Sequence, residues 1–166
     1  MEQEIIESKE QLKTDVSDEL LQLVSFKVGD AEFGVDILRV QEINKMMELT
    51  IVPNTPEFVV GVVNLRGRII PILNLRTRLG LPVKEYDLET RIIVVEMEDR
   101  TIGFIVDEVK EVLRIPKNIT EPPPDIVSGI DSDYITAIGK MEDRLLILLD
   151  LAKVLTSEEM NSLDEE

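Results

Sequence analysis

The stretch GVVNLRGRIIPILNLR, residues 61–76, is the one from which the fold can be predicted. Two apolar runs, 61–65 and 69–75, flank a polar turn made by Arg66, Gly67 and Arg68. The runs are short and rich in β-branched residues, and a glycine lies between them, so the pattern predicts a β-hairpin rather than a helix. Its tip carries two arginines in a chain of formal net charge −16, which makes the tip a candidate recognition site.

Composition restricts the class of protein. The 166 residues include 18 basic and 34 acidic side chains, with no cysteine and no histidine. Disulfides and thiol chemistry are therefore excluded, and the commonest general base and transition-metal ligand is missing. The negative charge opposes binding to nucleic-acid phosphate and to anionic lipid. No apolar run approaches the ~18 residues of a membrane span, and the acidic N-terminus is unlike a signal peptide, so we expect a soluble cytoplasmic protein.

The alternation of apolar and polar residues predicts three further pairs of strands. They cover residues 20–28 with 31–35, residues 90–97 with 101–106, and residues 134–141 with 144–149. Short helical segments are expected where an Asp or Asn side chain can cap the first turn. These expected caps are Asp36, Asn74 and Asp150.

The connections between the strands are less regular. Thr55 as N-cap and Pro56 at the first position predict one helical turn through Phe58. Residues 107–113 are expected to repeat the bent segment that follows the first strand pair. Residues 114–134 contain Pro116 and a proline triplet, and they predict a stiff loop that cannot be a central strand.

The ends of the chain differ from its middle. Residues 1–18 are polar and acidic, which predicts a disordered N-terminal tail. Residues 19–156 are expected to form the folded domain, made of two interleaved, pseudo-repeated β-barrel subdomains. Ser157 can cap an acidic C-terminal helix over residues 157–166.

The two halves of the chain repeat each other. Gly34 aligns with Gly103, and Arg68 aligns with Arg144 within similar apolar runs. The second half carries an insertion, for which the proline-rich loop is the natural place. Strands this short are best protected by closing into a small barrel, which removes exposed edges. The fold class predicted is therefore mainly β, with two small five-stranded barrels packed side by side, short helices, and a groove where the barrels meet.

No sequence motif points to catalysis. The Walker phosphate loop, the G-x-G-x-x-G fingerprint and the G-x-S-x-G nucleophile elbow are all missing. Carboxylate pairs such as Glu96 with Glu98 could serve a hydrolase if they faced each other across a cleft. A chain with 34 acidic residues offers such pairs by chance, and it lacks tryptophan for a sugar platform. We therefore expect a protein that is not an enzyme.

The candidates for binding lie in the first half. Arg66 offers a planar fork for carboxylates, although it could also be a solvated charge or the partner of a local glutamate. Glu42 lies between apolar neighbours, and strict alternation places it on the same side as Val40; it could equally be an exposed strand carboxylate. Val109 and Val112 of the second half occupy places comparable to Val40 and Ile43, and could be ordinary core residues.

Four motifs carry a resemblance to a known family. They are VQEI at 40–43, PNTPEF at 53–58, GVVNLRG at 61–67 and PILNLR at 71–76. Together they strongly resemble the CheW family of bacterial chemotaxis coupling proteins. The resemblance continues through GVDILRV at 34–40 and SEEM at 157–160, so it is dense from about residue 20 to residue 164.

The resemblance implies a non-enzymatic adaptor without cofactor, in which the two barrels are SH3-like. Such an adaptor joins transmembrane chemoreceptors to the histidine kinase CheA, whose regulatory domain it binds, in arrays at the membrane. The helical tip of the receptor is expected to dock in the groove between the barrels. Positions that match receptor-binding residues of the family are Val40, Glu42, Gly61, Arg66 and Val112. Asp125 and Ile126, after the proline triplet, match a kinase-facing patch.

One position departs from the family pattern, and alternatives stay open. Glu121 stands where some relatives carry arginine, so the ionic part of the kinase contact is expected to differ. A coupling protein of a non-flagellar chemosensory pathway would have the same sequence features. A CheW-like domain of CheV or CheA is also hard to separate from a free-standing CheW, and a hydrolase is the remaining alternative.

Overall fold

A computed structural model describes residues 2, 5, 20–97, 99–124 and 133–155. Its strands are β1 Leu20–Val28, β2 Ala31–Asp36, β3 Val40–Lys45, β4 Val59–Leu65, β5 Arg68–Asn74, β6 Arg91–Met97, β7 Arg100–Val106, β8 Glu108–Pro116, β9 Thr120–Glu121, β10 Ile135–Lys140 and β11 Leu145–Leu149. The helical segments are short: η1 Ile37–Arg39, α2 Leu75–Arg78, η2 Lys117–Ile119 and η4 Leu151–Lys153. The N-terminal tail and the C-terminal helix expected from the sequence lie outside the described residues. Within the described part, no helix is long and apolar enough to cross a membrane.

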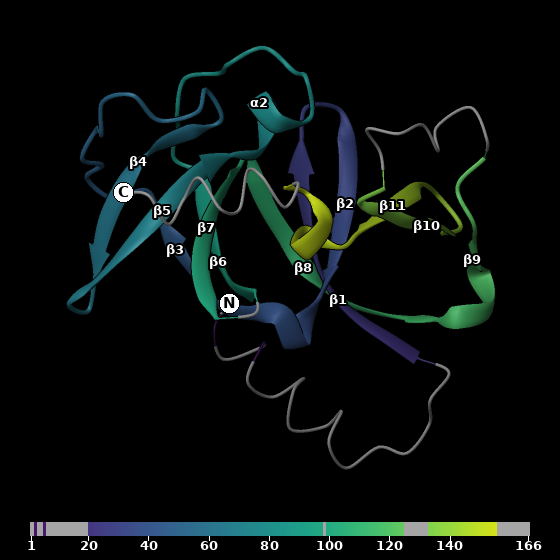
Figure 1. Ribbon diagram of the computed structural model, residues 1–166. Helices are drawn as coiled ribbons and strands as arrows, with labels where there is room; N and C mark the ends of the chain where they lie inside the picture. Colours follow the sequence, from purple (N-terminus) through teal and green to yellow (C-terminus); the bar gives the residue numbers. More distant parts are fainter. Residues whose placement is uncertain (1, 3–4, 6–19, 98, 125–132, 156–166) are drawn as a thin grey trace.

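The strands form two sheets that lie side by side (Figure 1). The five-stranded sheet has the order β3-β6-β7-β5-β4, and the six-stranded sheet has the order β8-β1-β2-β11-β10-β9. The prediction of a mainly β protein with two small SH3-like units is confirmed. Over the described strands neither sheet closes on itself, so β3 and β4 remain the edges of one sheet and β8 and β9 the edges of the other.

The two halves of the chain that repeat each other in sequence exchange a pair of strands in the structure. The first half supplies β1 and β2 to the six-stranded sheet, and the second half supplies β6 and β7 to the five-stranded sheet. In each sheet the exchanged hairpin pairs with the other half on both of its sides. One pairing is parallel, Gly34 with Leu148 and Gly103 with Ile72, and the other is antiparallel, β1 with β8 and β6 with β3. Each sheet is therefore built from both halves of the chain, and the two halves cannot separate without breaking strand pairing.

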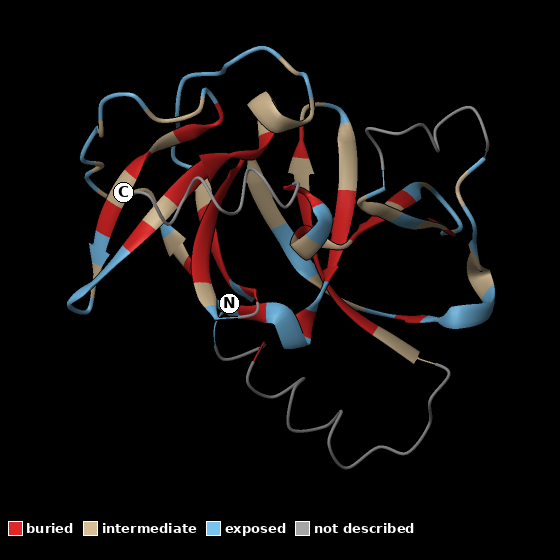
Figure 2. Cartoon of the chain, viewed as in Figure 1, coloured by how far each residue is buried: buried red, intermediate tan, exposed pale blue. Residues whose placement is uncertain are grey.

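The largest apolar cluster lies between the sheets and takes residues from both (Figure 2). We call it the central core; fully buried Phe26 of β1 and Phe104 of β7 belong to it. A second cluster, with Ile72 and Ile92, covers the far side of the five-stranded sheet. A third, with Leu23 and Leu148, covers the far side of the six-stranded sheet. Because the central core is shared, the two units form one cooperative structure.

The predicted hairpins and helix caps are confirmed. Each cap side chain accepts a hydrogen bond from a backbone N–H of the following turn: Asp36 from Leu38, Asn74 from Arg76 and Asp150 from Ala152. These are the donors that a helix start leaves without partners inside the helix. Asp36 ends β2, Asn74 ends β5 and Asp150 follows β11. In both halves, therefore, an Asp or Asn side chain marks the change from strand to helical turn.

The helical turn expected at residues 55–58 is wrong. The backbone there makes a turn, in which the Val59 N–H donates to the Pro56 carbonyl at 2.9 Å. The Thr55 hydroxyl donates to the Val52 carbonyl at 3.2 Å instead of accepting from the following turn. A threonine side chain that is satisfied by the preceding carbonyl is not available as a cap.

The bent segment expected at residues 107–113 is also wrong. Glu108–Pro116 is one nine-residue strand, β8, that pairs antiparallel with β1 from Leu20 opposite Pro116 to Lys27 opposite Glu108. The strand lies at a sheet edge, where one row of backbone groups faces away from the sheet. An edge position tolerates both the charged residues and the terminal proline of this strand.

Candidate functional site

The tip of the β4–β5 hairpin has an unusual backbone. Arg66 and Gly67 both have positive φ, 55° and 85°, which defines the two-residue turn that best matches strand twist. Such turns prefer Asn-Gly, and an arginine in the left-handed region costs of order 1 kcal/mol. The Asn64 side chain supports the turn by accepting a hydrogen bond from the Gly67 N–H at 2.9 Å. A strained arginine at an exposed turn is a sign that the side chain itself is needed there.

Arg66 and Glu42 meet across the face of the five-stranded sheet. Arg66 Nη1 donates to Glu42 Oε2 at 2.7 Å, and Asn44 Nδ2 donates to Glu42 Oε1 at 2.9 Å. The Glu42 side chain is 9% exposed, whereas that of Arg66 is 73% exposed. The buried carboxylate therefore holds one edge of the guanidinium, and most of the guanidinium remains accessible to a partner. The alternative of a local glutamate partner for Arg66 is correct, and it leaves room for recognition.

Val40 and Glu42 do not lie on the same side of β3, contrary to the prediction. Val40 pairs with Val95 and Glu42 pairs with Val94, so the register shifts by one residue between them. Val95 belongs to the central core and Val94 to the cluster on the far side of the sheet. The extra residue, Gln41, is a β-bulge, and a bulge reverses the side on which all later side chains point. Val40 is fully buried, and therefore reaches a partner only through its neighbours.

Gly61 lies where a neighbouring segment crosses β4 closely. Thr50 exchanges two backbone hydrogen bonds of 2.9 Å with Val62, and a Cβ at Gly61 would overlap the Thr50 carbonyl oxygen. The glycine is thus needed for the path of residues 46–52, which cover the second cluster through Met46, Met47 and Leu49. Its match to a receptor-binding position can therefore reflect the shape of the site rather than direct contact.

Gly61→Ala is expected to lower the free energy of unfolding by about 1–3 kcal/mol, the usual cost of overpacking. Any loss of receptor binding should accompany that destabilisation. Urea unfolding and receptor pull-down on the same variant test the link. Gly139→Ala is the matched control, because its Cβ would meet Ile115 at an ordinary 3.4 Å. A Gly61→Ala protein of wild-type stability that no longer binds receptor would show instead that Gly61 touches the partner.

Val109 and Val112 lie on β8, in the other sheet, and are half-buried. Both pack against the central core, and Val112 pairs with Val24. The equivalent residue of the first half, Ile43, pairs with Ile93. The valines thus form part of the wall between the sheets, in agreement with the interpretation that they are core residues. Among the five predicted receptor-binding positions, the structure brings Glu42 and Arg66 into direct contact.

The predicted kinase-facing residues Asp125 and Ile126 lie outside the described residues. The segment leading to them is described. Its residues Pro122 and Pro124 border a cavity of about 800 Å³, which Ile147 of β11 also lines. Glu121, the position that departs from the family, forms an ion pair with Lys140, whose Nζ donates to Glu121 Oε1 at 2.9 Å. Both partners of that pair are more than half exposed, so its contribution to stability is small.

Arg68 and Arg144, which are aligned in the internal repeat, make equivalent contacts. Arg68 donates to the Thr101 hydroxyl at 2.9 Å, and Arg144 Nε lies 2.8 Å from Glu32 Oε1. Thr101 and Glu32 occupy corresponding positions of β7 and β2. These contacts support the interpretation that the repeated arginine ties a hairpin to its neighbour, whereas Arg66 has no counterpart in the repeat.

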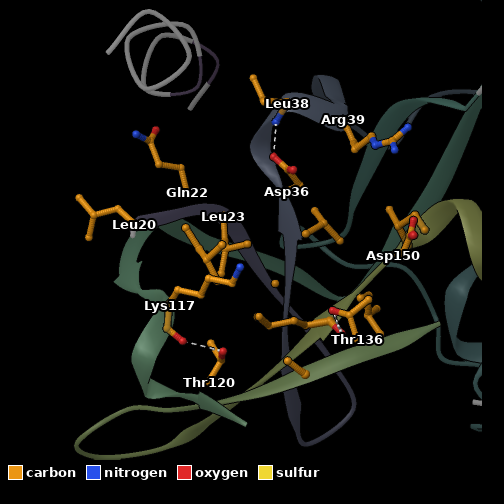
Figure 3. A pocket seen from close by; sticks show the side chains of 17 residues that line it. Leu20, Gln22, Leu23, Asp36, Leu38, Arg39, Lys117, Thr120, Thr136 and Asp150 are labelled. Carbon is orange, nitrogen blue, oxygen red and sulfur yellow. Dashed lines mark hydrogen bonds between the residues drawn. The ribbon is translucent and has the colours of Figure 1, made fainter. Parts of the chain in front are cut away.

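Sequence reasoning missed a second cavity, of about 420 Å³, on the six-stranded sheet (Figure 3). Buried Leu23 and Leu148 line it, and Arg39 and Lys117 stand at its margin. Gln22 also lines it, and its buried Oε1 has no hydrogen-bond partner within the described part of the chain. No sequence signal marks this cavity, because its lining comes from strands far apart in the chain.

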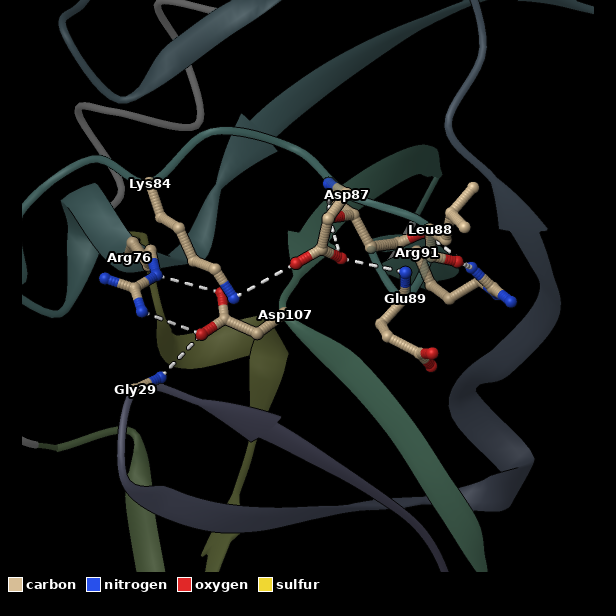
Figure 4. A network of polar contacts seen from close by, with 9 residues as sticks. Gly29, Arg76, Lys84, Asp87, Leu88, Glu89, Arg91 and Asp107 are labelled. Atoms are coloured by element: carbon tan, nitrogen blue, oxygen red, sulfur yellow. Dashed lines mark hydrogen bonds and ion pairs between the residues drawn. The ribbon is translucent and has the colours of Figure 1, made fainter.

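Sequence reasoning also missed an ionic clamp between the sheets (Figure 4). Arg76 donates to both carboxylate oxygens of Asp107, through Nε and Nη2 at 2.8 Å each, and its Nη1 donates to the Pro82 carbonyl. The Gly29 N–H, in the β1–β2 turn, donates to Asp107 Oδ2 at 2.8 Å, and the Asp107 N–H donates to the Lys27 carbonyl. The clamp therefore joins α2, the end of β7 and the β1–β2 turn.

The clamp shifts the ionisation of both partners. Burial by itself would raise the pKa of Asp107, but the hydrogen bonds from Arg76 and Gly29, with the charge of Arg76, outweigh burial and hold that pKa below its ordinary value. The hydrogen bond to Asp107 raises the pKa of Arg76. Both side chains are about 15% exposed, so the pair is shielded from solvent.

These features define a class of protein. The described residues hold no group of three or more side chains that could bind a metal ion. The site instead combines an exposed, pre-positioned arginine, a buried carboxylate that orients it, and a rigid double-barrel frame. An exposed, oriented arginine on such a frame is suited to bind a carboxylate or carbonyl group through charge and shape, so the fold and the site are those expected of a binding protein.

Comparison with known proteins identifies the family. A family profile described as CheW-like domain matches residues 22–159. The Chemotaxis protein CheW of Klebsiella aerogenes is 40% identical over 139 residues, which are 84% of this chain and 84% of that protein. The Chemotaxis protein CheW of Helicobacter pylori is 38% identical over 144 residues, 86% of each chain.

A solved structure agrees with these relatives. The crystal structure of the scaffolding protein TtCheW from Thermoanaerobacter tengcongensis superposes with a TM-score of 0.77 at 37% identity, and the match covers 84% of this chain and 94% of that chain. The chain therefore belongs to the CheW family. The family consists of chemotaxis scaffold proteins, so the expectation that this protein is not an enzyme is confirmed.

Proposed function

We propose that this protein is a chemotaxis adaptor that couples transmembrane chemoreceptors to the histidine kinase CheA. The observation that carries the proposal is the geometry of Arg66. An exposed arginine is held in a strained backbone conformation by a type of turn that prefers asparagine, and buried Glu42 orients it. The left-handed backbone of Arg66 costs of order 1 kcal/mol, and a strained residue at an exposed turn is typical of one kept for a partner.

The surroundings of Arg66 suit a helical partner. The cytoplasmic tip of a chemoreceptor is a helical hairpin, and a helix is commonly recognised by an apolar surface with a few charges beside it. Met46 and Met47 lie half-buried in the segment that follows β3, four and five residues beyond Glu42. Methionine side chains adapt to different helix faces. Arg66 then selects an acidic or carbonyl-bearing position on the receptor.

The kinase contact is proposed for the segment after the proline triplet, in the second half of the chain. The segment after Pro124, with Asp125 and Ile126, would bind the regulatory domain of the kinase. Two separate contacts on one rigid frame allow a change in the receptor to bias the kinase. The protein would then act in the cytoplasm, at receptor arrays. A coupling protein of another chemosensory pathway would use the same surfaces with different partners.

A three-component pull-down tests the adaptor function. The purified chain is mixed with a receptor signalling fragment and with the kinase regulatory domain, each alone and both together. An adaptor binds both partners at once. The receptor fragment should therefore be recovered with the immobilised kinase domain only when the chain is present. Mutual exclusion of the two partners, or binding of neither, would overturn the proposal.

Ile126→Asp is expected to weaken binding of the kinase regulatory domain by at least about tenfold, because a charge replaces an apolar contact in a desolvated interface. Isothermal titration calorimetry measures the change. Leu88→Asp is the control, since Leu88 is 92% exposed on another loop and undergoes the same substitution. Wild-type affinity in Ile126→Asp would remove this residue from the kinase contact, while leaving the receptor contact untouched.

A further inference from the structure

Asn44 of β3 is a polar residue beside an apolar cluster. It pairs with Ile92, and Glu42 pairs with Val94. Both of these partners belong to the cluster on the far side of the five-stranded sheet. Because directly paired residues point to the same face of a sheet, Asn44 lies next to Glu42 on that face. Asn44 is half-buried there, where an amide lowers stability unless it is hydrogen-bonded.

The amide of Asn44 serves the carboxylate that holds Arg66. Asn44 Nδ2 donates to Glu42 Oε1 at 2.9 Å, and Arg66 Nη1 donates to Glu42 Oε2 at 2.7 Å. The last torsion of a glutamate side chain is only loosely restricted, so a single hydrogen bond leaves the carboxylate free to turn. A donor on each oxygen fixes its plane. Glu42 is only 7% exposed, so its second donor comes from Asn44 rather than from bulk water.

The second half of the chain provides an internal comparison. In the alignment of the two halves, Glu42 corresponds to Glu111. Asn44 corresponds to Leu113, which packs against the cluster on the far side of the six-stranded sheet. The Glu111 side chain is 54% exposed, and Arg66 has no counterpart in that half. The amide is therefore present in the half that has the arginine, and an apolar residue takes its place in the half that does not.

The strand geometry supports this alignment. In β3 the register shifts across Gln41, and in β8 it shifts across Lys110, which is the residue aligned with Gln41. The side chains that follow the two bulges therefore point to corresponding faces of the two sheets. The difference between Asn44 and Leu113 is thus a difference in chemistry at one equivalent place.

The order of the Arg66 side chain depends on what holds Glu42. An arginine side chain has many rotamers, and ordering such a side chain when a partner binds costs binding free energy. Arg66 is 73% exposed, so packing restricts it little, and its hydrogen bond to Glu42 is what directs the guanidinium. A group that fixes the Glu42 carboxylate therefore also orders Arg66 before the partner arrives.

We propose that Asn44 is a positioning residue of the Arg66 site. Its amide fixes the Glu42 carboxylate, and the fixed carboxylate presents the guanidinium in one orientation to an acidic or carbonyl group of the receptor. The role of Asn44 in binding rests on the receptor contact proposed above, whereas the ordering of Arg66 is a property of the free protein. The two parts can therefore be tested separately.

The ordering is tested in the free protein with Asn44→Leu. This substitution removes the donor without adding charge, and it introduces the residue that the second half carries at the aligned position. Relaxation of the ¹⁵N nucleus in the Arg66 Nε–H group measures the order of the side chain on the picosecond to nanosecond timescale. In Asn44→Leu the order parameter should fall toward that of the exposed Arg39 in the same spectrum.

Gln41→Leu is the matched control for Asn44→Leu. Gln41 lies in the same strand, and its Nε2 donates to Glu96 Oε2 at 2.8 Å, so this substitution also removes an amide that serves a carboxylate. It should leave the order of Arg66 and the receptor affinity unchanged. Circular dichroism and urea unfolding check that each variant is folded, and leucine at position 44 can pack against the apolar cluster.

The role in binding is tested with the receptor signalling fragment. Asn44→Leu should weaken its binding about three- to tenfold, which is the cost of ordering one flexible side chain at an interface. Isothermal titration calorimetry measures the change. Adding Asn44→Leu to Arg66→Ala should cause no further loss, because Asn44 acts through Arg66. Binding of the kinase regulatory domain should be unchanged in every variant.

The possible outcomes separate this proposal from the proposed function. An Arg66 side chain that keeps its order in Asn44→Leu would overturn the positioning role, whatever the receptor affinity. A further loss of affinity in the double variant would mean that Asn44 touches the receptor itself, which also overturns that role. If the wild-type protein binds no receptor fragment, the receptor contact is wrong, and the order of Arg66 in the free protein still decides whether Asn44 positions it.

Discussion

Asp107→Asn is expected to lower the free energy of unfolding by about 3 kcal/mol, the lower end of the range for removing one partner of a buried ion pair. The substitution leaves the guanidinium of Arg76 shielded without its counter-charge, and it weakens the acceptor of the Gly29 N–H. The β1–β2 turn and α2 lose their common partner. Urea unfolding followed by circular dichroism measures the difference.

The matched control is Glu121→Gln, which removes a carboxylate from an exposed pair with Lys140. Its cost should stay within about 1 kcal/mol, as is usual for a surface salt bridge. If the two substitutions lower the free energy of unfolding equally, the clamp contributes no more than a surface ion pair. The inference that it links the sheets would then be wrong.

The destabilisation by Asp107→Asn should also depend on pH. The pKa of Asp107 is lowered in the folded state, so its contribution is fully present above the ordinary carboxyl pKa of ~3.9. It is lost as pH falls from there through the lowered folded pKa, because the carboxylate must then be protonated in both states. The difference between wild type and variant should therefore shrink in that acidic range and stay constant near neutrality.

Arg66→Glu is expected to weaken binding of a receptor signalling fragment at least about a hundredfold, the loss of a charged hot-spot residue. The substitution removes the exposed guanidinium and places a second carboxylate beside buried Glu42. Kinase binding and the circular dichroism spectrum should be unchanged, because Arg66 is 73% exposed and lies on a turn. Pull-down with each partner separately measures the two effects.

Arg68→Glu is the control for Arg66→Glu, since it changes the net charge equally and lies two residues away in the same hairpin. Arg68 contacts Thr101 within the sheet, as Arg144 contacts Glu32 in the repeat, so its loss should affect stability more than recognition. Equal loss of receptor binding in both variants would mean that overall charge, and not the Arg66 site, attracts the receptor. Equal loss of both partners in Arg66→Glu would mean that the residue is structural.

Local features were the ones that could be predicted from the sequence. The hairpins follow from alternation and turn residues, and the three caps follow from an Asp or Asn directly after a strand. Arg66 could be singled out because the repeat shares Arg68 with Arg144 and leaves Arg66 without a counterpart. The Thr55 cap failed because a competing carbonyl, that of Val52, satisfies the same hydroxyl.

Features that depend on distant partners could not be predicted. The bulge at Gln41 exists because β3 must match the register of β6, and nothing within β3 marks it. β8 is a strand because β1 offers it an edge, which residues 108–116 do not reveal by themselves. The clamp of Arg76 with Asp107 joins residues that are adjacent only after the hairpins have exchanged between the halves.

The sequence alone therefore determined that this protein is an acidic, repeated, mainly β binding protein of the CheW type, with Arg66 as its most informative charge. Only the tertiary structure decided that Glu42 orients Arg66, that Val40 is buried on the opposite side, and that a cavity of about 420 Å³ opens on the six-stranded sheet. The physical reason is the range of the interactions. Turns, caps and alternation act over a few residues, whereas register, ion pairing and cavity filling depend on which distant strands meet.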